Sequence, residues 1–200
     1  GNYTGTKSSS FNIVKLGVTK PTAKANLTYT GSSQTGVTFV SGAGYSLQSG
    51  GATSGINAGS YTATFVLDGN HKWSDGTTTN VTITWTISPK SVAVSWTNTS
   101  FTYDGTSHAP TASVASGITG ETINLTVSGA QTNAGNNYTA TATLSSVTGG
   151  QAKTSNYTLT NTSTAFEITS AILANPVVSV DSNGKITWAA IAGATSYDVS

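Results

Sequence analysis

The sequence predicts an all-β protein built from tandem antiparallel β-sandwich domains, and three observations support this prediction. Apolar and hydroxyl-bearing residues alternate strictly in several short segments, which is typical of half-buried strands. Turn pairs such as Asp104-Gly105 and Asn183-Gly184 separate these segments. The same motifs also recur along the chain with a period of roughly 75–80 residues, which indicates an array of similar units.

Four segments show the alternation most clearly. In each of them apolar residues fall on one face, and threonines occupy much of the other face. Because successive side chains of a strand point to opposite faces of the sheet, we expect the apolar faces to form the sandwich cores. The residues expected to face inward are Tyr61, Ala63, Phe65 and Leu67; Val81, Ile83, Trp85 and Ile87; Ile123, Leu125 and Val127; and Tyr138, Ala140, Ala142 and Leu144.

Three motifs define the repeat. Each unit opens on a Tyr-x-Gly turn, continues with a strand that follows Asn-Ala-Gly, and closes on an aromatic–x–Ile strand. The opening motifs lie at 27–31 and 101–105, the middle motifs at 57–67 and 133–144, and the closing pairs are Trp85/Ile87 and Phe166/Ile168, with a further pair at Phe11/Ile13. The chain is therefore expected to be a section of a repeat array.

The motif spacing places the first full unit at 16–89 and the second at 90–171. Pro89 lies at the join, and this suits the end of a strand because proline cannot donate to a strand ladder. Residues 1–15 are expected to be the closing strands of a preceding repeat. Residues 172–200 differ in character, with a proline entry and an Asn-Gly turn, and are expected to be the first strands of another module.

The motifs Tyr29-Thr30-Gly31 and Tyr103-Asp104-Gly105, together with the middle and closing strands, resemble the bacterial repeats of the MBG/YDG type. Residues 172–200, with Trp188 and Tyr197, resemble the start of a fibronectin type III module. The resemblance implies Ig-like β-sandwiches in a secreted or cell-wall-attached, adhesin-like surface protein, and it implies no catalytic residue. The first unit has Thr30 where the second has Asp104, so no role of that carboxylate is shared.

Composition excludes several partners. Charged residues make up 8% of the chain and the net charge is +1, which argues against nucleic acid as a partner because such proteins carry basic stripes. The same low charge argues against a polybasic contact with a membrane, and no apolar run is long enough to span one. The chain has no cysteine, so its domains are expected to rely on their cores alone.

A Ser–His–Asp combination occurs at Asp104, Ser107 and His108. A catalytic triad is assembled by geometry across a fold, however, and the first unit has Gln34 in place of His108. We therefore interpret this segment as a turn at a strand edge. The sequence predicts no enzyme, no catalytic residue and no cofactor.

Metal and ligand sites are also weakly indicated. Asp68, Asn70 and Asp75 could contribute oxygen ligands for calcium, but an ordinary hairpin loop is the favoured interpretation, and no metal site is predicted. His71 and Trp73 are the only ligand-binding candidates, as a platform on which a sugar could stack. Burial of Trp73 is favoured over this role because it aligns near an aromatic residue of the second unit.

Surface proteins without cysteine can carry lysine–asparagine cross-links that need a nearby carboxylic acid as a proton shuttle. Glu121 shares the inward direction of Ile123 and is the candidate for this role, whereas Glu167 is expected to face outward.

The predicted function is that of non-catalytic stalk or spacer repeats in an extracellular bacterial surface protein. The expected partners are neighbouring repeats of the same chain, and the expected state is a monomer. Three alternatives stay open: a module that binds host mucin or wall glycans, an accessory region of a secreted glycan-degrading enzyme, and a subunit of a self-assembling filament.

Overall fold

A computed structural model describes residues 1–200 apart from residues 3, 192–193, 195 and 199–200. The regular secondary structure of the described part consists of β-strands and one short 3-10 turn, Thr154–Asn156, which confirms the predicted all-β sandwich fold. It contains no helix long and apolar enough to cross a membrane. Residue contacts divide the chain into two compact units, of which the first comprises Gly1–Ala93, Ala115–Asn124 and Leu144–Thr160 and the second comprises Val94–Val114, Leu125–Thr143 and Asn161–Ser200.

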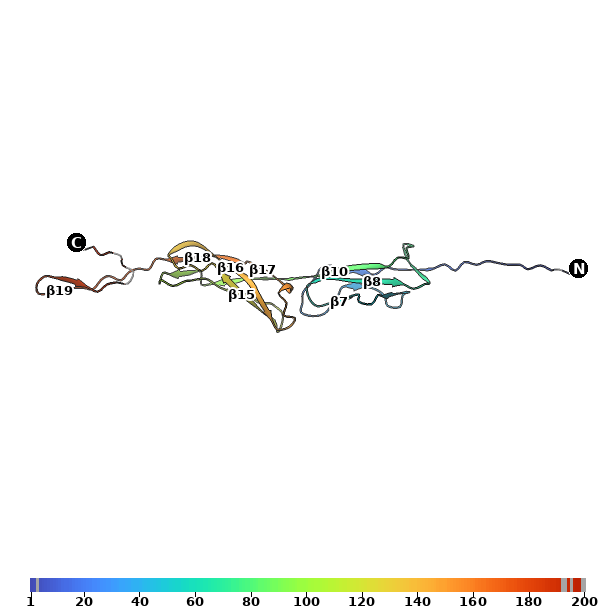
Figure 1. The fold of residues 1–200 in the computed structure, drawn as a ribbon, viewed down its shortest axis with the longest axis horizontal. Coiled ribbons are helices and arrows are strands. Elements are labelled where there is room, and N and C mark those ends of the chain that lie inside the picture. The colour runs from blue at the N-terminus through green and yellow to red at the C-terminus, as the bar shows by residue number, and fades with distance from the viewer. Residues whose placement is uncertain (3, 192–193, 195, 199–200) are drawn as a thin grey trace. The chain divides into compact units, whose positions relative to one another are not determined.

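The first repeat is organised around one four-stranded sheet. Its strand order is β3-β10-β8-β6, and Figure 1 shows β8 and β10 side by side. The bounds are β3 (Leu27–Thr28), β10 (Val81–Ser88), β8 (Gly59–Leu67) and β6 (Tyr45–Leu47). Three two-stranded pairs accompany it, namely β1 (Leu16–Val18) with β9 (His71–Trp73), β2 (Thr22–Ala23) with β5 (Val37–Thr38), and β4 (Gln34–Thr35) with β7 (Ser54–Gly55).

The second repeat has a sheet of the same design. Its order is β13-β18-β16-β15, with β13 (Ser100–Thr102), β18 (Ser163–Thr169), β16 (Gly135–Thr148) and β15 (Thr122–Ser128). The accompanying pairs are β11 (Lys90–Ala93) with β17 (Tyr157–Thr160), and β12 (Ser95–Thr97) with β14 (Thr111–Ser113). After this repeat, β19 (Val178–Val180) and β20 (Ile186–Trp188) form a hairpin.

In addition to the expected antiparallel pairs, both main sheets contain one parallel pair. β10 is antiparallel to β8 but parallel to β3, and β18 is antiparallel to β16 but parallel to β13. A parallel pair needs a long connection between its two strands, and here almost the whole repeat provides it. Sequence alternation could not reveal this feature because it does not encode strand direction.

The registers of the two closing strands correspond residue by residue. Trp85 lies opposite Tyr61 and Ile87 opposite Gly59, while Phe166 lies opposite Tyr138 and Ile168 opposite Gly135. The second repeat has one more residue between its glycine and its tyrosine, and a register shift between Gly135 and Tyr138 accommodates it. Such a bulge keeps the following inward-facing residues on their proper face.

Burial follows the predicted alternation in both repeats. Of the closing strands, Trp85, Ile87, Phe166 and Ile168 are buried. Trp85 is stacked on Tyr61 with ring centres 4.4 Å apart, and its indole N–H donates to the Ala52 carbonyl at 2.8 Å. A Cβ on Gly36 would lie 1.9 Å from the Trp85 ring, so only glycine fits beneath it.

The outer segments are less packed. In the described part of residues 1–15 no strand forms, and Phe11 and Ile13 are 83% and 87% exposed. A closing strand is held by two neighbouring strands, as β10 is, and no described strand pairs with this segment. Its assignment to a preceding repeat therefore stays a prediction. In the last segment, the rings of Trp188 and Tyr197 lie 5.5 Å apart.

We expect Trp85→Ala to lower the free energy of unfolding by about 3–5 kcal/mol, because it removes a buried indole and leaves a cavity against Tyr61. Chemical denaturation of the purified chain measures this change. Thr84→Ala is the matched control, because Thr84 is exposed on the same strand, and we expect it to stay within about 0.5 kcal/mol of the wild type. Equal effects of the two substitutions would contradict the core assignment of Trp85.

Candidate functional site

The most distinctive polar feature of the chain is the buried carboxylate of Glu121. Glu121 is only 7% exposed and directly precedes β15, and the buried Ile123 follows two positions later. The inward direction predicted for Glu121 is thus confirmed. The buried Ser116 shapes the loop before it, because the Ser116 hydroxyl donates to the Glu121 carbonyl at 2.7 Å.

Two tyrosine hydroxyls and one amide satisfy this carboxylate. Tyr29 donates to Oε1, Tyr157 donates to Oε2 at 2.6 Å, and the backbone N–H of Gln151 donates to Oε1 at 3.1 Å. The two tyrosine rings pack edge to face with centres 5.5 Å apart. Hydrogen bonds to an ionised oxygen are stronger than those between neutral groups, so they offset much of the cost of burying the charge.

Glycines make room for this arrangement at the end of β16. A Cβ on Gly149 would lie 1.9 Å from the Gly120 carbonyl oxygen, and a Cβ on Gly150 would lie 2.3 Å from Glu121 Oε1. Both glycines also have positive φ. The close approach brings the next amide, that of Gln151, to the carboxylate.

Two asparagines lie beside the tyrosines. The Asn156 side chain accepts a hydrogen bond from the Ala58 N–H at 2.8 Å and donates to the Asn57 side chain at 3.0 Å. Asn156 is fully buried. We call Tyr29, Asn57, Glu121, Asn156 and Tyr157 the Glu121 cluster. All five belong to the first compact unit, although Tyr29 and Asn57 come from the first sequence repeat and the other three from the second.

Burial and hydrogen bonding compete in setting the charge of the cluster. Burial alone would raise the pKa of Glu121, but the hydrogen bonds from Tyr157, Tyr29 and the Gln151 amide outweigh it and lower that pKa. Burial, followed by the hydrogen bond to Glu121 and its negative charge, raises the pKa of Tyr29 to about 12. The same causes also raise the pKa of Tyr157. At neutral pH the cluster therefore holds one carboxylate and two neutral phenols.

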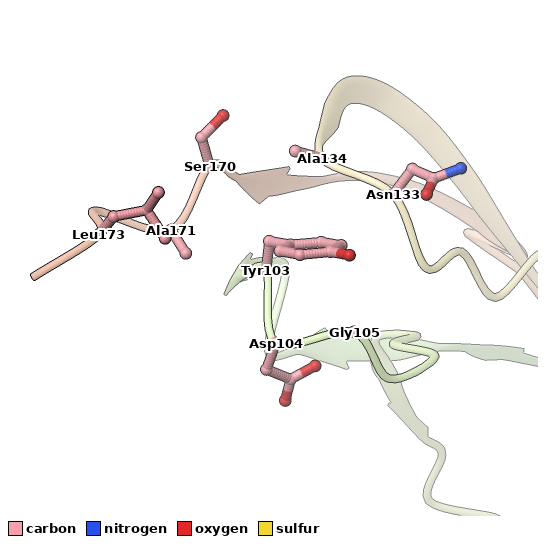
Figure 2. Close-up of a pocket in the computed structure, with 8 residues that line it drawn as sticks. All are labelled: Tyr103, Asp104, Gly105, Asn133, Ala134, Ser170, Ala171 and Leu173. Carbon is pink, nitrogen blue, oxygen red and sulfur yellow. The ribbon is translucent and has the colours of Figure 1, made fainter. Parts of the chain in front are cut away.

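In the second repeat, the tyrosine equivalent to Tyr29 lines an open pocket. Tyr103 occupies the equivalent place, since its N–H donates to the last residue of β18 as that of Tyr29 donates to the last residue of β10. Figure 2 shows the Tyr103 ring between Asn133 and the Asp104–Gly105 turn. We call this the Tyr103 pocket, and its lining residues are Tyr103, Asp104, Gly105, Asn133, Ala134, Ser170, Ala171 and Leu173.

The predicted ligand-binding candidates lie elsewhere in the fold. Trp73 is fully buried, and its indole N–H donates to the Thr79 carbonyl at 2.8 Å. A ring without exposed surface offers no face on which a sugar could stack. His71 is half-buried, and its Nδ1 lies 2.5 Å from the Asp68 carboxylate. Trp73 also corresponds to Tyr157, because each belongs to the strand that pairs in parallel with the first strand of its repeat.

The suspected triad residues form a turn. One oxygen of Asp104 accepts hydrogen bonds from the Thr106 N–H, the Thr106 hydroxyl and His108 Nε2 at 2.8, 2.7 and 2.9 Å. The Thr106 hydroxyl and then its N–H are the main causes that lower the pKa of Asp104 to about 2. His108 stacks on Phe101, and no hydrogen bond joins it to Ser107 in the described part of the chain.

The acidic loop residues are engaged in local contacts as well. Asp75 accepts from the Thr77 hydroxyl at 2.7 Å and from the Lys20 amine at 2.6 Å, while Asp68 accepts from the Asn70 N–H at 2.9 Å. Among the residues that the structure describes, no three His, Cys, Asp or Glu side chains gather as metal ligands would.

The contacts of Glu121 bear on the cross-link hypothesis. Its carboxylate is bound by two phenols and an amide, and the Lys90 amine donates instead to the Gly117 carbonyl at 3.1 Å. No hydrogen bond joins a lysine amine to an asparagine side chain among the described residues. Among the described residues, the proton-shuttle role of Glu121 therefore has no hydrogen-bonded lysine–asparagine pair to support it.

Sequence reasoning missed Tyr29, Asn57 and Asn156 as parts of one cluster. One signal was present in the sequence: the Asp68-Gly69 turn follows Leu67 directly, whereas four residues separate the equivalent Leu144 from the Gly149-Gly150 turn. In the structure β8 accordingly ends at Leu67, and β16 continues to Thr148. These additional strand residues, with Glu121 beside them, belong to the first compact unit.

Comparisons with known proteins give no further guide to this site. No protein-family model matches the chain, and neither a curated protein nor a solved structure proved similar to it.

We expect Glu121→Ala to lower the free energy of unfolding by ~1–3 kcal/mol for each tyrosine hydroxyl that it leaves buried without an acceptor. Chemical denaturation measures the loss. Glu167→Ala is the matched control, because Glu167 is an exposed carboxylate of the same repeat that accepts one hydrogen bond from Ser100. If the two substitutions lower the free energy of unfolding by similarly small amounts, the cluster does not stabilise the fold.

The pH dependence of stability should follow the lowered pKa of Glu121. Its contribution is present above the ordinary value of 4.5 and is lost as the pH falls through the lower value of the folded state. We therefore expect the stability difference between the wild type and Glu121→Gln to shrink as the pH falls below 4.5. Denaturation curves at a series of acidic pH values measure this difference, and a constant difference would contradict the assignment.

Proposed function

We propose that the chain consists of non-catalytic spacer repeats of an extracellular bacterial surface protein. The observation that carries this proposal is the Glu121 cluster, in which side chains of two successive repeats share one buried polar network. A network of this kind couples neighbouring repeats energetically, because breaking it leaves a carboxylate and two phenols without partners. An array of spacer repeats gains stability from such energetic coupling between neighbouring repeats.

The surface chemistry is compatible with this role. The outward faces of the long strands carry mainly threonine, and the Thr64 and Thr82 hydroxyls on paired strands lie 3.0 Å apart. With few charges and many hydroxyls, the chain lacks the charged field that would attract nucleic acid or a membrane. The resemblance to MBG/YDG repeats supports the extracellular location.

The Tyr103 pocket favours one second candidate, a glycan-binding module. Tyr103 is 40% exposed, and the polar residues Asp104 and Asn133 lie beside its ring. An exposed aromatic face next to polar residues is suited to a sugar. The first repeat lacks this feature because Tyr29 is 1% exposed.

A single-molecule pulling experiment between the two chain ends tests the spacer function. We expect Glu121→Ala to lower the force at which the first repeat unfolds, since the network that holds its Tyr29 is lost, whereas Glu167→Ala should leave that force unchanged. Equal unfolding forces for the wild type and Glu121→Ala would contradict the proposal.

A screen of the same chain on mucin glycans and wall polysaccharides provides the second readout. We expect no specific binding by the folded protein. Specific binding that Tyr103→Ala abolishes would instead establish the glycan-binding module.

A further inference from the structure

The two Tyr-x-Gly turns have the same backbone hydrogen bonds but different surroundings. Tyr29 donates its N–H to the Ser88 carbonyl at 2.9 Å, and Tyr103 donates its N–H to the Thr169 carbonyl at 2.8 Å. The glycine of each motif has a positive φ, which is 77° for Gly31 and 80° for Gly105. The turns are therefore two copies of one local structure.

The adjoining Asn-Ala segments are equivalent too. Tyr61 donates its hydroxyl to the Asn57 carbonyl at 2.7 Å, and Tyr138 donates its hydroxyl to the Asn133 carbonyl at 3.2 Å. Each repeat thus places an Asn-Ala pair next to its Tyr-x-Gly turn. In the second repeat these two elements form the walls of the Tyr103 pocket (Figure 2).

In the first repeat this position is filled. Ile118 covers the turn, because a Cβ on Gly31 would lie 2.7 Å from Ile118 Cγ2. Glu121 binds the Tyr29 hydroxyl, and Asn156 binds both residues of the Asn57-Ala58 pair. Every one of these covering groups comes from residues 115–124 and 144–160.

In the second repeat no described residue fills the same position. A Cβ on Gly105 would meet no atom within 4 Å, and Asn133 and Ala134 are exposed where Asn57 and Ala58 are half-buried. Asp104 replaces Thr30, but one of its oxygens is bound within its own turn, and Figure 2 shows its carboxylate directed away from the Tyr103 ring. The pocket therefore remains open to a carboxylate that binds the Tyr103 hydroxyl.

We propose that the Tyr103 pocket is a docking site for another copy of the second repeat. In this arrangement Glu121 of the added copy accepts a hydrogen bond from Tyr103, its Asn156 binds Asn133 and the Ala134 N–H, and its Ile118 covers Gly105. The second repeat thus carries both halves of the contact, the docking residues Ile118, Glu121 and Asn156 and the pocket around Tyr103. Chain connection supports this order, because Ser170, Ala171 and Leu173, which follow β18, line the pocket themselves.

The first repeat carries only the pocket half. Its strand β8 stops at Leu67, so it lacks the additional strand residues that place Glu121 in the second repeat. Repeats of the second type can therefore be added one after another, whereas a repeat of the first type cannot dock on another in this way. The inference extends the proposed spacer function to the kind of neighbour that the array accepts.

The test is a chain in which a copy of residues 90–171 is inserted between Ala171 and Ile172. The copy carries Phe at its own Tyr103 position, so that nitration at this position can come only from the original Tyr103. Nitration of tyrosines by tetranitromethane, located by peptide mass spectrometry, measures exposure. In the 200-residue chain we expect Tyr103 to react and the buried Tyr29 to be protected. In the extended chain we expect Tyr103 to react at least roughly tenfold more slowly, because docking buries it.

The matched control is a separate extended chain whose single inserted copy also carries Glu121→Ala. We expect this change to restore the reactivity of the original Tyr103. Unchanged reactivity beside a folded copy, as judged by its own denaturation transition, would overturn the proposal. So would a Tyr103 that is already protected in the 200-residue chain, since residues 172–200 would then fill the pocket.

A double-mutant cycle keeps the proposal testable should nitration be disturbed by local unfolding. We expect Tyr103→Phe to lower the free energy of unfolding of the extended chain but not that of the 200-residue chain. When the copy also carries Glu121→Ala, we expect Tyr103→Phe to lower this free energy no further. Additive effects would overturn the proposal. Glycan binding at Tyr103 would contradict the spacer function without altering these cycles, so the two failures are distinguishable.

Discussion

The structure depends most on the burial of one carboxylate, that of Glu121. Glu121 retains its charge because two phenols and a backbone amide donate to it, and removing any donor leaves a buried charge only partly satisfied. Hydrogen bonds demand defined distances and directions, whereas apolar contacts tolerate sliding. The buried polar network therefore specifies which groups meet, while the surrounding apolar residues provide most of the stabilisation.

This constraint explains features that appear unrelated in the sequence. Gly149 and Gly150 allow the chain to pass close to the Glu121 loop, Ser116 holds that loop from the inside, and β16 is extended to reach it. Asn156 lies in a 3-10 turn directly before Tyr157, so a single turn supplies both an amide and a phenol to the cluster. Each of these features helps to bring a hydrogen-bond donor to the Glu121 carboxylate or to hold the loop that carries it.

The contrast between Tyr29 and Tyr103 shows how an array can vary within one fold. Both tyrosines begin from the same turn, yet one is buried and the other is an exposed residue of an open pocket. The backbone hydrogen bonds of the two turns are the same, and the difference lies in what packs on each turn. In a repeat protein the function of a position is accordingly set by its neighbours, and the same motif can be structural in one copy and available for recognition in the next.

The sequence by itself determined the all-β fold, the inward faces of the long strands, the burial of Trp85 and the inward direction of Glu121, because these depend on local alternation with a period of two. It also indicated that Trp73 and Tyr157 hold equivalent places. Tertiary structure alone decided the parallel pairing of the opening strands, the burial of Tyr29 and the exposure of Tyr103. These features depend on residues 92 positions apart, as Tyr29 and Glu121 are, and on strand direction, neither of which a local pattern encodes.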